Sequence, residues 1–163
     1  MTNSEIYNQR FQQLQREFIA AKKKKANKWQ YKPHQQAMYD FVVYAKRMVE
    51  FSINDYTIVL RIGNDDFGFR HILLRHYCDE CVGRLFARDI LNIGNIIKND
   101  IELPAHRNRI KFIQNKGDIK YTVILTSEYS KRLVFTYFSS EPKKAIEIKL
   151  EDSELGQSKR TTT

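Results

Sequence analysis

Residues 107–126 read RNRIKFIQNKGDIKYTVILT, and this stretch decides the fold. Polar and apolar side chains largely alternate over residues 107–113, and the strand-favouring run 121–126 follows the turn residues 115–118. Such runs on both sides of a turn that contains Gly predict an antiparallel β-hairpin. A further strand is expected at residues 133–138.

The segments before this hairpin predict helices with one strand among them. Residues 57–62 are rich in β-branched and apolar side chains, whereas residues 84–98 carry apolar side chains at helical spacing. Helices followed by a run of strands are typical of the α+β class. We therefore expect N-terminal helices followed by a mainly antiparallel sheet of about four strands packed on helices, with a short last strand near residues 145–150.

Residues 1–52 have the pattern of a basic helical hairpin. Each arm carries an apolar stripe at spacings of three and four, namely Tyr7, Phe11, Leu14 and Phe18, then Ala37, Phe41, Tyr44, Met48 and Phe51. Pro33 suits the first turn of the second arm. We expect this hairpin to extend a compact domain over residues 53–150, followed by a disordered polar tail over residues 151–163.

Residues 68–76 place two of the four histidines on one expected helix, which we extend to about Val82. Imidazole exchanges protons near neutral pH, and guanidinium is a fixed partner for phosphate, so His71, His76 and Arg75 are candidate site residues. A purely structural role remains the alternative for both histidines. His76 falls between Ile72 and Leu73 in helical angle, and one ring could therefore belong to the core.

Cys78 and Cys81 lie three residues apart on the same expected helix. This separation is unsuited to a structural disulfide, so the sequence favours two partly buried thiols in a reducing compartment. A zinc site would need a second ligand pair, and His34 and His106 lack ligand-like spacing. A thioredoxin-like role would need the motif where a strand turns into a helix. We expect no metal and no cofactor.

The chain carries a net charge of +9, and its first 52 residues hold +6 of it. Such an excess is typical of a protein whose partner is rich in phosphate or anionic lipid. A run of four lysines fits a solvated helix face, a nucleic-acid contact or a membrane-surface patch: Lys22, Lys23, Lys24 and Lys25. The nearby Trp29 and Tyr31 favour the nucleic-acid contact, because aromatic rings stack on bases. The sequence has no secretory signal and no run of about 18 apolar residues, so we expect a cytoplasmic site of action without membrane insertion.

The first strand of the hairpin carries cations on one face. Alternation puts Arg107, Arg109 and Lys111 on one side of the strand and Ile110 and Phe112 on the other. If the apolar side meets the helices, the cations line an open face and bind phosphate. The alternative is the ordinary solvated face of an antiparallel sheet.

The order of these segments resembles one superfamily. The helix Gly-x-x-His-Ile-x-x-Arg-His, a helix ending in Ile-Ile-Lys-Asn-Asp, the basic strand and the strands Tyr-Thr-Val-Ile-Leu and Leu-Val-x-Thr carry the likeness, which covers residues 56–138. They are similar to the barnase, EndoU, colicin-type anticodon nuclease and RelE-like ribonucleases, in particular their phage-borne and mobile-element branch. The resemblance implies a metal-independent RNA-cleaving site with these members: His71 or His76, Arg109 or Lys111, and Thr136.

We therefore expect a metal-independent endoribonuclease, a toxin or mobile-element effector that leaves a 2′,3′-cyclic phosphate. Histidine would move protons from the 2′-hydroxyl and to the 5′-oxygen, while cations stabilise charge on phosphorus. The expected partners are RNA, with transfer RNA as one candidate, and an acidic immunity or antitoxin protein. The expected RNA-binding residues are Arg75, Arg107 and the four lysines. The alternative is a non-catalytic nucleic-acid-binding or assembly protein of a phage or mobile element, in which the basic hairpin binds.

Overall fold

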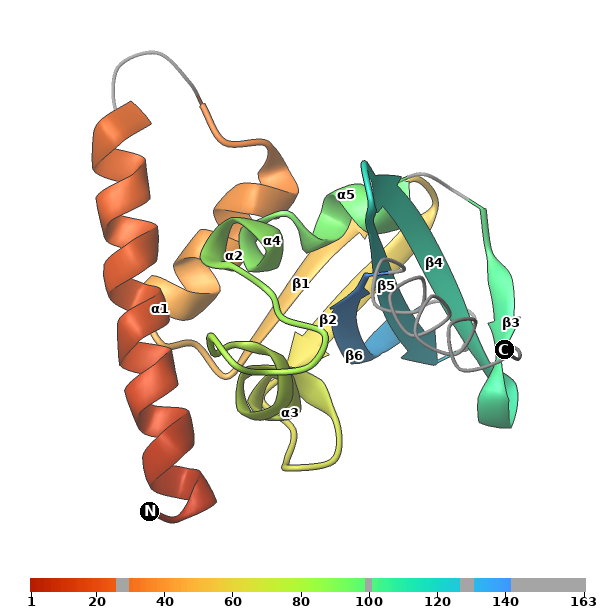
Figure 1. Cartoon of the computed structure of the whole chain (residues 1–163). Coiled ribbons are helices and arrows are strands. Elements are labelled where there is room, and N and C mark those ends of the chain that lie inside the picture. The colour runs from red at the N-terminus through yellow and green to blue at the C-terminus, as the bar shows by residue number, and fades with distance from the viewer. Residues whose placement is uncertain (26–29, 99–100, 127–130, 142–163) are drawn as a thin grey trace, which may run out of the picture.

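The chain folds into helices and a six-stranded sheet, which confirms the α+β class (Figure 1). The computed structural model describes residues 1–25, 30–98, 101–126 and 131–141. The expected strand at 145–150 and the tail at 151–163 lie outside the described residues. The elements in chain order are α1 (Asn3–Lys25), α2 (Pro33–Val43), β1 (Met48–Ile53), β2 (Tyr56–Arg61), α3 (Gly68–His76), α4 (Ala87–Leu91), α5 (Ile93–Lys98), β3 (Leu103–Ala105), the 3-10 turn η1 (His106–Asn108), β4 (Arg109–Lys116), β5 (Ile119–Thr126) and β6 (Lys131–Ser140).

The strands form one sheet in the order β1-β2-β6-β5-β4-β3. β2 and β6 run parallel where residues 57–59 pair with residues 131–133, and the other neighbouring strands are antiparallel. The predicted hairpin is confirmed, since β4 and β5 pair along their whole length. The sheet has six strands rather than about four because β1 and β3 add to the expected set.

The second N-terminal helix is shorter than the apolar spacing predicts. α2 ends at Val43, and β1 takes the place of its expected continuation to Phe51. Tyr44 and Met48 fit the helical stripe but are exposed. The two-residue period overrides the helical one here because it buries three side chains on one face of β1, namely Val49, Phe51 and Ile53.

The histidine helix α3 ends at His76 rather than near Val82, and residues 77–86 form a loop. Within this loop a turn joins Cys78 and Cys81, which form a disulfide with their Cα atoms 5.3 Å apart. The prediction of two free thiols is wrong, because residues 78–81 form a turn beyond the end of α3 rather than part of a helix, and the two side chains of this turn are bonded to each other. The helix expected over residues 84–98 is divided at Asn92 into α4 and α5.

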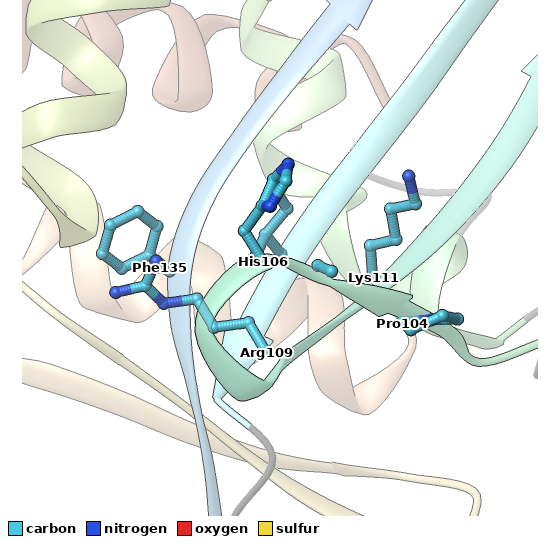
Figure 2. Close-up of a pocket in the computed structure, with 7 residues that line it drawn as sticks. Pro104, His106, Arg109, Lys111 and Phe135 are labelled. Atoms are coloured by element: carbon cyan, nitrogen blue, oxygen red, sulfur yellow. The ribbon is translucent and has the colours of Figure 1, made fainter.

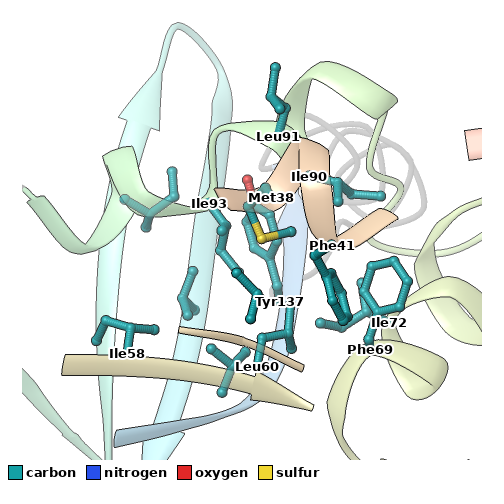
Figure 3. Close-up of a cluster of buried hydrophobic side chains, with 14 of the residues drawn as sticks. Met38, Phe41, Ile58, Leu60, Phe69, Ile72, Ile90, Leu91, Ile93 and Tyr137 are labelled. Atoms are coloured by element: carbon teal, nitrogen blue, oxygen red, sulfur yellow. The ribbon is translucent and has the colours of Figure 1, made fainter. Parts of the chain in front are cut away.

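One hydrophobic core joins the helices to the sheet (Figure 3). Side chains from α1, α2, the sheet and α3 belong to it, among them Leu14, Met38, Phe41, Leu60, Phe69, Ile72 and Tyr137. Fully burying one such side chain contributes about 2 kcal/mol, so this packing fixes the position of α3 and its histidines. No helix in the described ranges is long and apolar enough to cross a membrane.

Candidate nucleic-acid interface

A pocket of about 410 Å³ lies on the face of the sheet formed by β3, η1, β4, β5 and β6 (Figure 2). Arg109 and Lys111 reach it because they share one face of β4, while Ile110 and Phe112 on the other face are buried. The structure thus brings two of the three predicted strand cations together. The full lining is Pro104, Ala105, His106, Arg109, Lys111, Ile124 and Phe135.

Arg107, the third cation, does not lie on the strand as predicted. It is exposed in η1, where Arg107 and Asn108 have positive φ angles of 59° and 60°. This turn reverses the chain so that Ala105 pairs with Arg109, and it brings His106 to the pocket. Left-handed residues other than Gly cost about 1–2 kcal/mol each, and backbone strain of this kind clusters at functional sites.

His106 is a pocket residue that sequence reasoning missed, and Phe135 is another. A signal was present, because Asn108 directly before the basic strand is a turn-favouring residue. A tight hairpin at this point returns the preceding residue to the side of the following strand. Periodicity alone does not show the turn, since it needs two successive left-handed residues.

Phe135 connects the pocket to the start of α3. The guanidinium carbon of Arg109 lies 3.7 Å from the centroid of the Phe135 ring, and the Phe67 ring stacks on the same ring at 6.3 Å. The β5–β6 register shifts at Leu125, next to Phe135, and such a bulge redirects side chains. Phe67 precedes α3 directly, and His71 follows it at a spacing of one helical turn. A cation and two rings therefore run from the pocket to the histidine helix.

His71 and His76 form a pair with ring centroids 5.9 Å apart. Nδ1 of His71 lies 2.9 Å from the carbonyl oxygen of Asp65, and Nδ1 of His76 lies 2.8 Å from that of Val82. A carbonyl oxygen only accepts, so each Nδ1 donates its proton and each Nε2 is left as the basic nitrogen. Neither Nε2 has a hydrogen-bond partner among the described residues, and neither is sealed from solvent.

The protonation of His76 also depends on its surroundings. Burial lowers its pKa, the hydrogen bond to Val82 opposes this, and the positive charges of His71 and Arg75 lower the pKa further. The neutral ring is therefore favoured at neutral pH. With its proton on Nδ1, His76 has the tautomer and charge of a proton acceptor at Nε2.

Polar contacts hold α3 at both ends. At its start, Nε of Arg70 lies 2.6 Å from a carboxylate oxygen of Asp65, whose carbonyl holds His71. At its end, Nη1 of Arg10 in α1 donates to the carbonyl oxygens of Leu73 and Leu74 at 2.9 and 2.6 Å. The Leu73 carbonyl also accepts from the N–H of Tyr77 at 3.4 Å, whereas the last turn of a helix leaves a carbonyl such as that of Leu74 without a backbone partner, so Arg10 supplies one.

The histidine pair and the pocket lie on the same side of β6 but are separate groups. The His76 ring lies 5.8 Å from the Phe138 ring, and the β5–β6 register places Phe138 on the same face as Ile124 of the pocket. Neither His71 nor His76 lines the pocket. Arg75 of α3 is exposed and does not line it either.

The remaining predicted residues do not line the pocket. Thr136 pairs with Ile124, but it is buried, and its hydroxyl has no partner among the described residues. Lys22 lies 4.3 Å from the centroid of the Tyr39 ring of α2, and its own helix α1 lies across the molecule from β4 (Figure 1). Lys23 and Lys24 are exposed at the same end of α1, and the side chain of Lys25 lies outside the described part.

No cluster of three or more His, Cys, Asp and Glu side chains in the described ranges could hold a metal ion. No protein-family model matches the chain, no curated protein is significantly similar to it, and no solved structure matches it significantly. Function is therefore inferred from the geometry of the pocket and of the histidine pair.

Proposed function

We propose that this protein is an endoribonuclease that needs no metal ion and cleaves RNA through attack of the 2′-hydroxyl on the adjacent phosphorus. The pocket carries this proposal, because His106, Arg109 and Lys111 place an imidazole, a guanidinium and an ammonium group around one space of about 410 Å³. These are the groups that phosphodiester cleavage requires when RNA supplies its own nucleophile. The resemblance of residues 56–138 to barnase, EndoU, colicin-type and RelE-like ribonucleases supports the same activity.

Arg109 and Lys111 bind the scissile phosphate and stabilise the charge that builds up on it. His106 accepts the proton of the 2′-hydroxyl as the bond from the 2′-oxygen to phosphorus forms. The bond from phosphorus to the 5′-oxygen breaks, the 5′-oxygen takes a proton, and a 2′,3′-cyclic phosphate remains. Phe67, which is 39% exposed, offers a ring on which a neighbouring base stacks.

His71 and His76 are the alternative proton-transfer groups, because they form a group separate from the pocket. Their Nε2 atoms make no hydrogen bond within the described part of the chain, and the stacked rings of Phe135 and Phe67 join the pocket to the residue that precedes α3. Because the 2′-oxygen and the 5′-oxygen are bound to one phosphorus atom, the pair would act on a phosphate bound beside α3 rather than on the phosphate held in the pocket. Thr136, which is buried, has no role in contact with RNA in this arrangement.

The test is cleavage of single-stranded RNA in the presence of EDTA by the wild-type protein and by single variants. We expect Arg109→Ala and Lys111→Ala each to slow cleavage by about 100-fold or more, because each removes a donor to the developing charge. Lys116→Ala at the exposed end of β4 is the matched control and should cleave normally. Absence of cleavage by the wild-type protein, or normal rates for both pocket variants, would overturn the proposal.

Histidine variants locate the proton transfer. We expect His106→Ala to remove the limb of the pH–rate profile that reports the base, and the paired change His71→Ala, His76→Ala to leave the profile unchanged. Full activity of the variant that lacks both His71 and His76 would show that the reaction takes place in the pocket. Full activity of His106→Ala would show that it takes place at the histidines of α3.

A nucleic-acid-binding or assembly protein without catalysis is the second candidate function. It is favoured by the exposed Lys23 and Lys24 at the end of α1, a helix that lies across the molecule from β3 and β4 (Figure 1). If Lys23→Ala with Lys24→Ala abolishes RNA binding and the Arg109 and Lys111 variants bind normally, this second function holds.

As a toxin or mobile-element effector acting on transfer RNA or another RNA, the protein would present its cationic pocket to an acidic immunity or antitoxin protein.

A further inference from the structure

The loop between α3 and α4 places a disulfide next to the histidine pair. Cys78 and Cys81 close a turn in this loop, and Val82 directly follows Cys81. The carbonyl oxygen of Val82 is the acceptor for Nδ1 of His76 at 2.8 Å. The group that fixes the His76 tautomer is therefore one residue from the sulfur–sulfur bridge.

The same loop joins α3 to the end of β6. The backbone N–H of Ser139 donates to the carbonyl of Gly83 at 3.2 Å, and its hydroxyl donates to the carbonyl of Arg84 at 2.6 Å. The N–H of Leu85 donates to the carbonyl of His76 at 2.7 Å. Residues 83–85 are thus anchored to the sheet and to α3, and the disulfide constrains the segment just before them.

The disulfide is open to reagents. Both cysteines are only partly buried, and Cys81 lines a cavity of about 580 Å³ together with Val82 and Gly83. Nη1 of Arg10 lies 4.0 Å from the sulfur of Cys81. A nearby guanidinium stabilises a thiolate, so Cys81 is the better leaving group and the sulfur of Cys78 is the one attacked.

We propose that Cys78 and Cys81 form a dithiol-exchange site whose oxidation state sets the orientation of the His76 ring. A thiolate of an external dithiol attacks Cys78, the disulfide breaks, and a mixed disulfide forms while Cys81 leaves as the thiolate. The second thiol of the reagent then displaces Cys78. Two electrons and two protons pass to the protein, and the reagent leaves as a disulfide.

The consequence for His76 follows from the loop. With the bridge closed, the turn holds the Val82 carbonyl against Nδ1. With the bridge open, residues 78–82 gain backbone freedom and the carbonyl no longer holds one position. The proton of the neutral ring then distributes between Nδ1 and Nε2, and the fraction with a basic Nε2 falls.

Nitrogen-15 NMR of the histidine rings in the full chain tests this inference. Before and after treatment with dithiothreitol, free thiols are counted and the tautomer of each ring is read from its nitrogen shifts. In the oxidised protein, which has no free thiols, we expect the His76 ring to carry its proton on Nδ1. In the reduced protein, which has two free thiols, we expect a mixture of the two tautomers. His71 is the internal control, because the Asp65 carbonyl that holds it lies at the other end of α3. The paired change Cys78→Ser, Cys81→Ser should match the reduced protein without reagent.

Unchanged His76 signals once two thiols are present would overturn the inference. A chain that has two free thiols under oxidising conditions, or a matching change at His71, would overturn it as well. The effect on RNA cleavage rests on the proposed function, but the NMR readout does not use RNA. A shift at His76 without any RNA cleavage would leave the exchange site standing and remove the nuclease proposal.

Discussion

His34 of α2 lies in an environment unlike that of the other histidines. It is 4% exposed, and neither ring nitrogen has a hydrogen-bond partner among the described residues. Its ring lies against the bare backbone of Gly94 in α5, where an added Cβ would come within 2.6 Å of it. A polar ring therefore fills a packing position between two helices, and its charge state bears on stability rather than on the site.

Acid should destabilise the protein through His34. Burial lowers the pKa of His34 below its ordinary 6.5, the charges of Lys32 and Lys98 lower it further, and the nearby side chain of Asn95 opposes part of this shift. Between the two pKa values the unfolded chain binds more protons than the folded chain, so the free energy of unfolding falls as pH drops below 6.5. We expect a lower urea midpoint at pH 5 than at pH 7.

The variant His34→Leu checks the source of this dependence. Its urea midpoint should change less between the two pH values, although His76, whose pKa is also lowered, keeps part of the effect. An undiminished dependence in His34→Leu would show that His34 is not responsible.

At the scale of elements, α1 acts as a support for the histidine helix. Arg10 reaches across from α1 to the last carbonyls of α3, and Glu17 of α1 accepts a hydrogen bond from the hydroxyl of Tyr77 just beyond α3. Cationic groups at a helix C-terminus are also favourable to the helix dipole. The N-terminal helix is thus tied to the candidate site.

Replacing Arg10 by Met should lower the free energy of unfolding by about 1.5–3 kcal/mol, because hydrogen bonds from a charged group are lost at partly buried carbonyls. Chemical denaturation measures this loss. Lys23→Met on the same helix is the control, since Lys23 is exposed, and it should stay within about 0.5 kcal/mol of the wild type. Equal effects of the two changes would contradict this support by α1.

The turn η1 offers a second test at this scale. Because Arg107 has a φ of 59°, Arg107→Gly should raise the free energy of unfolding by about 1 kcal/mol, while Arg107→Val should lower it. Thermal unfolding of both variants measures these two changes in stability. A loss of stability in Arg107→Gly would show that the side chain contributes more than the backbone strain costs.

The elements also show where sequence patterns predict structure and where they do not. Arg109 and Lys111 were placed on one face because a strand alternates strictly, and their pairing with β5 keeps that alternation. β1 was not predicted because apolar residues at 48 and 51 satisfy a helical spacing as well as part of a strand. Phe135 and His106 join the site next to a bulge and through a left-handed turn, and both features depend on neighbouring strands that local sequence does not reveal.

At the scale of the whole molecule, the helices and sheet share one core and leave one side of β4, β5 and β6 to polar chemistry. The expected convergence of histidines and cations takes a different form from the one predicted. Arg109 and Lys111 line one pocket with His106, and the pair His71 and His76 forms a separate group on α3. Two separate groups of this kind suit an extended ligand, such as the proposed RNA, rather than a single small molecule.

The most direct measurement compares two oligonucleotides of one sequence, RNA and its fully 2′-O-methylated form, each incubated with the wild-type protein in EDTA. Methylation removes the nucleophile while the phosphates and bases remain. The 2′-hydroxyl mechanism predicts that only the RNA is cut and that its 5′ fragments end in a 2′,3′-cyclic phosphate. Intact RNA, or equal cutting of both strands, would contradict it.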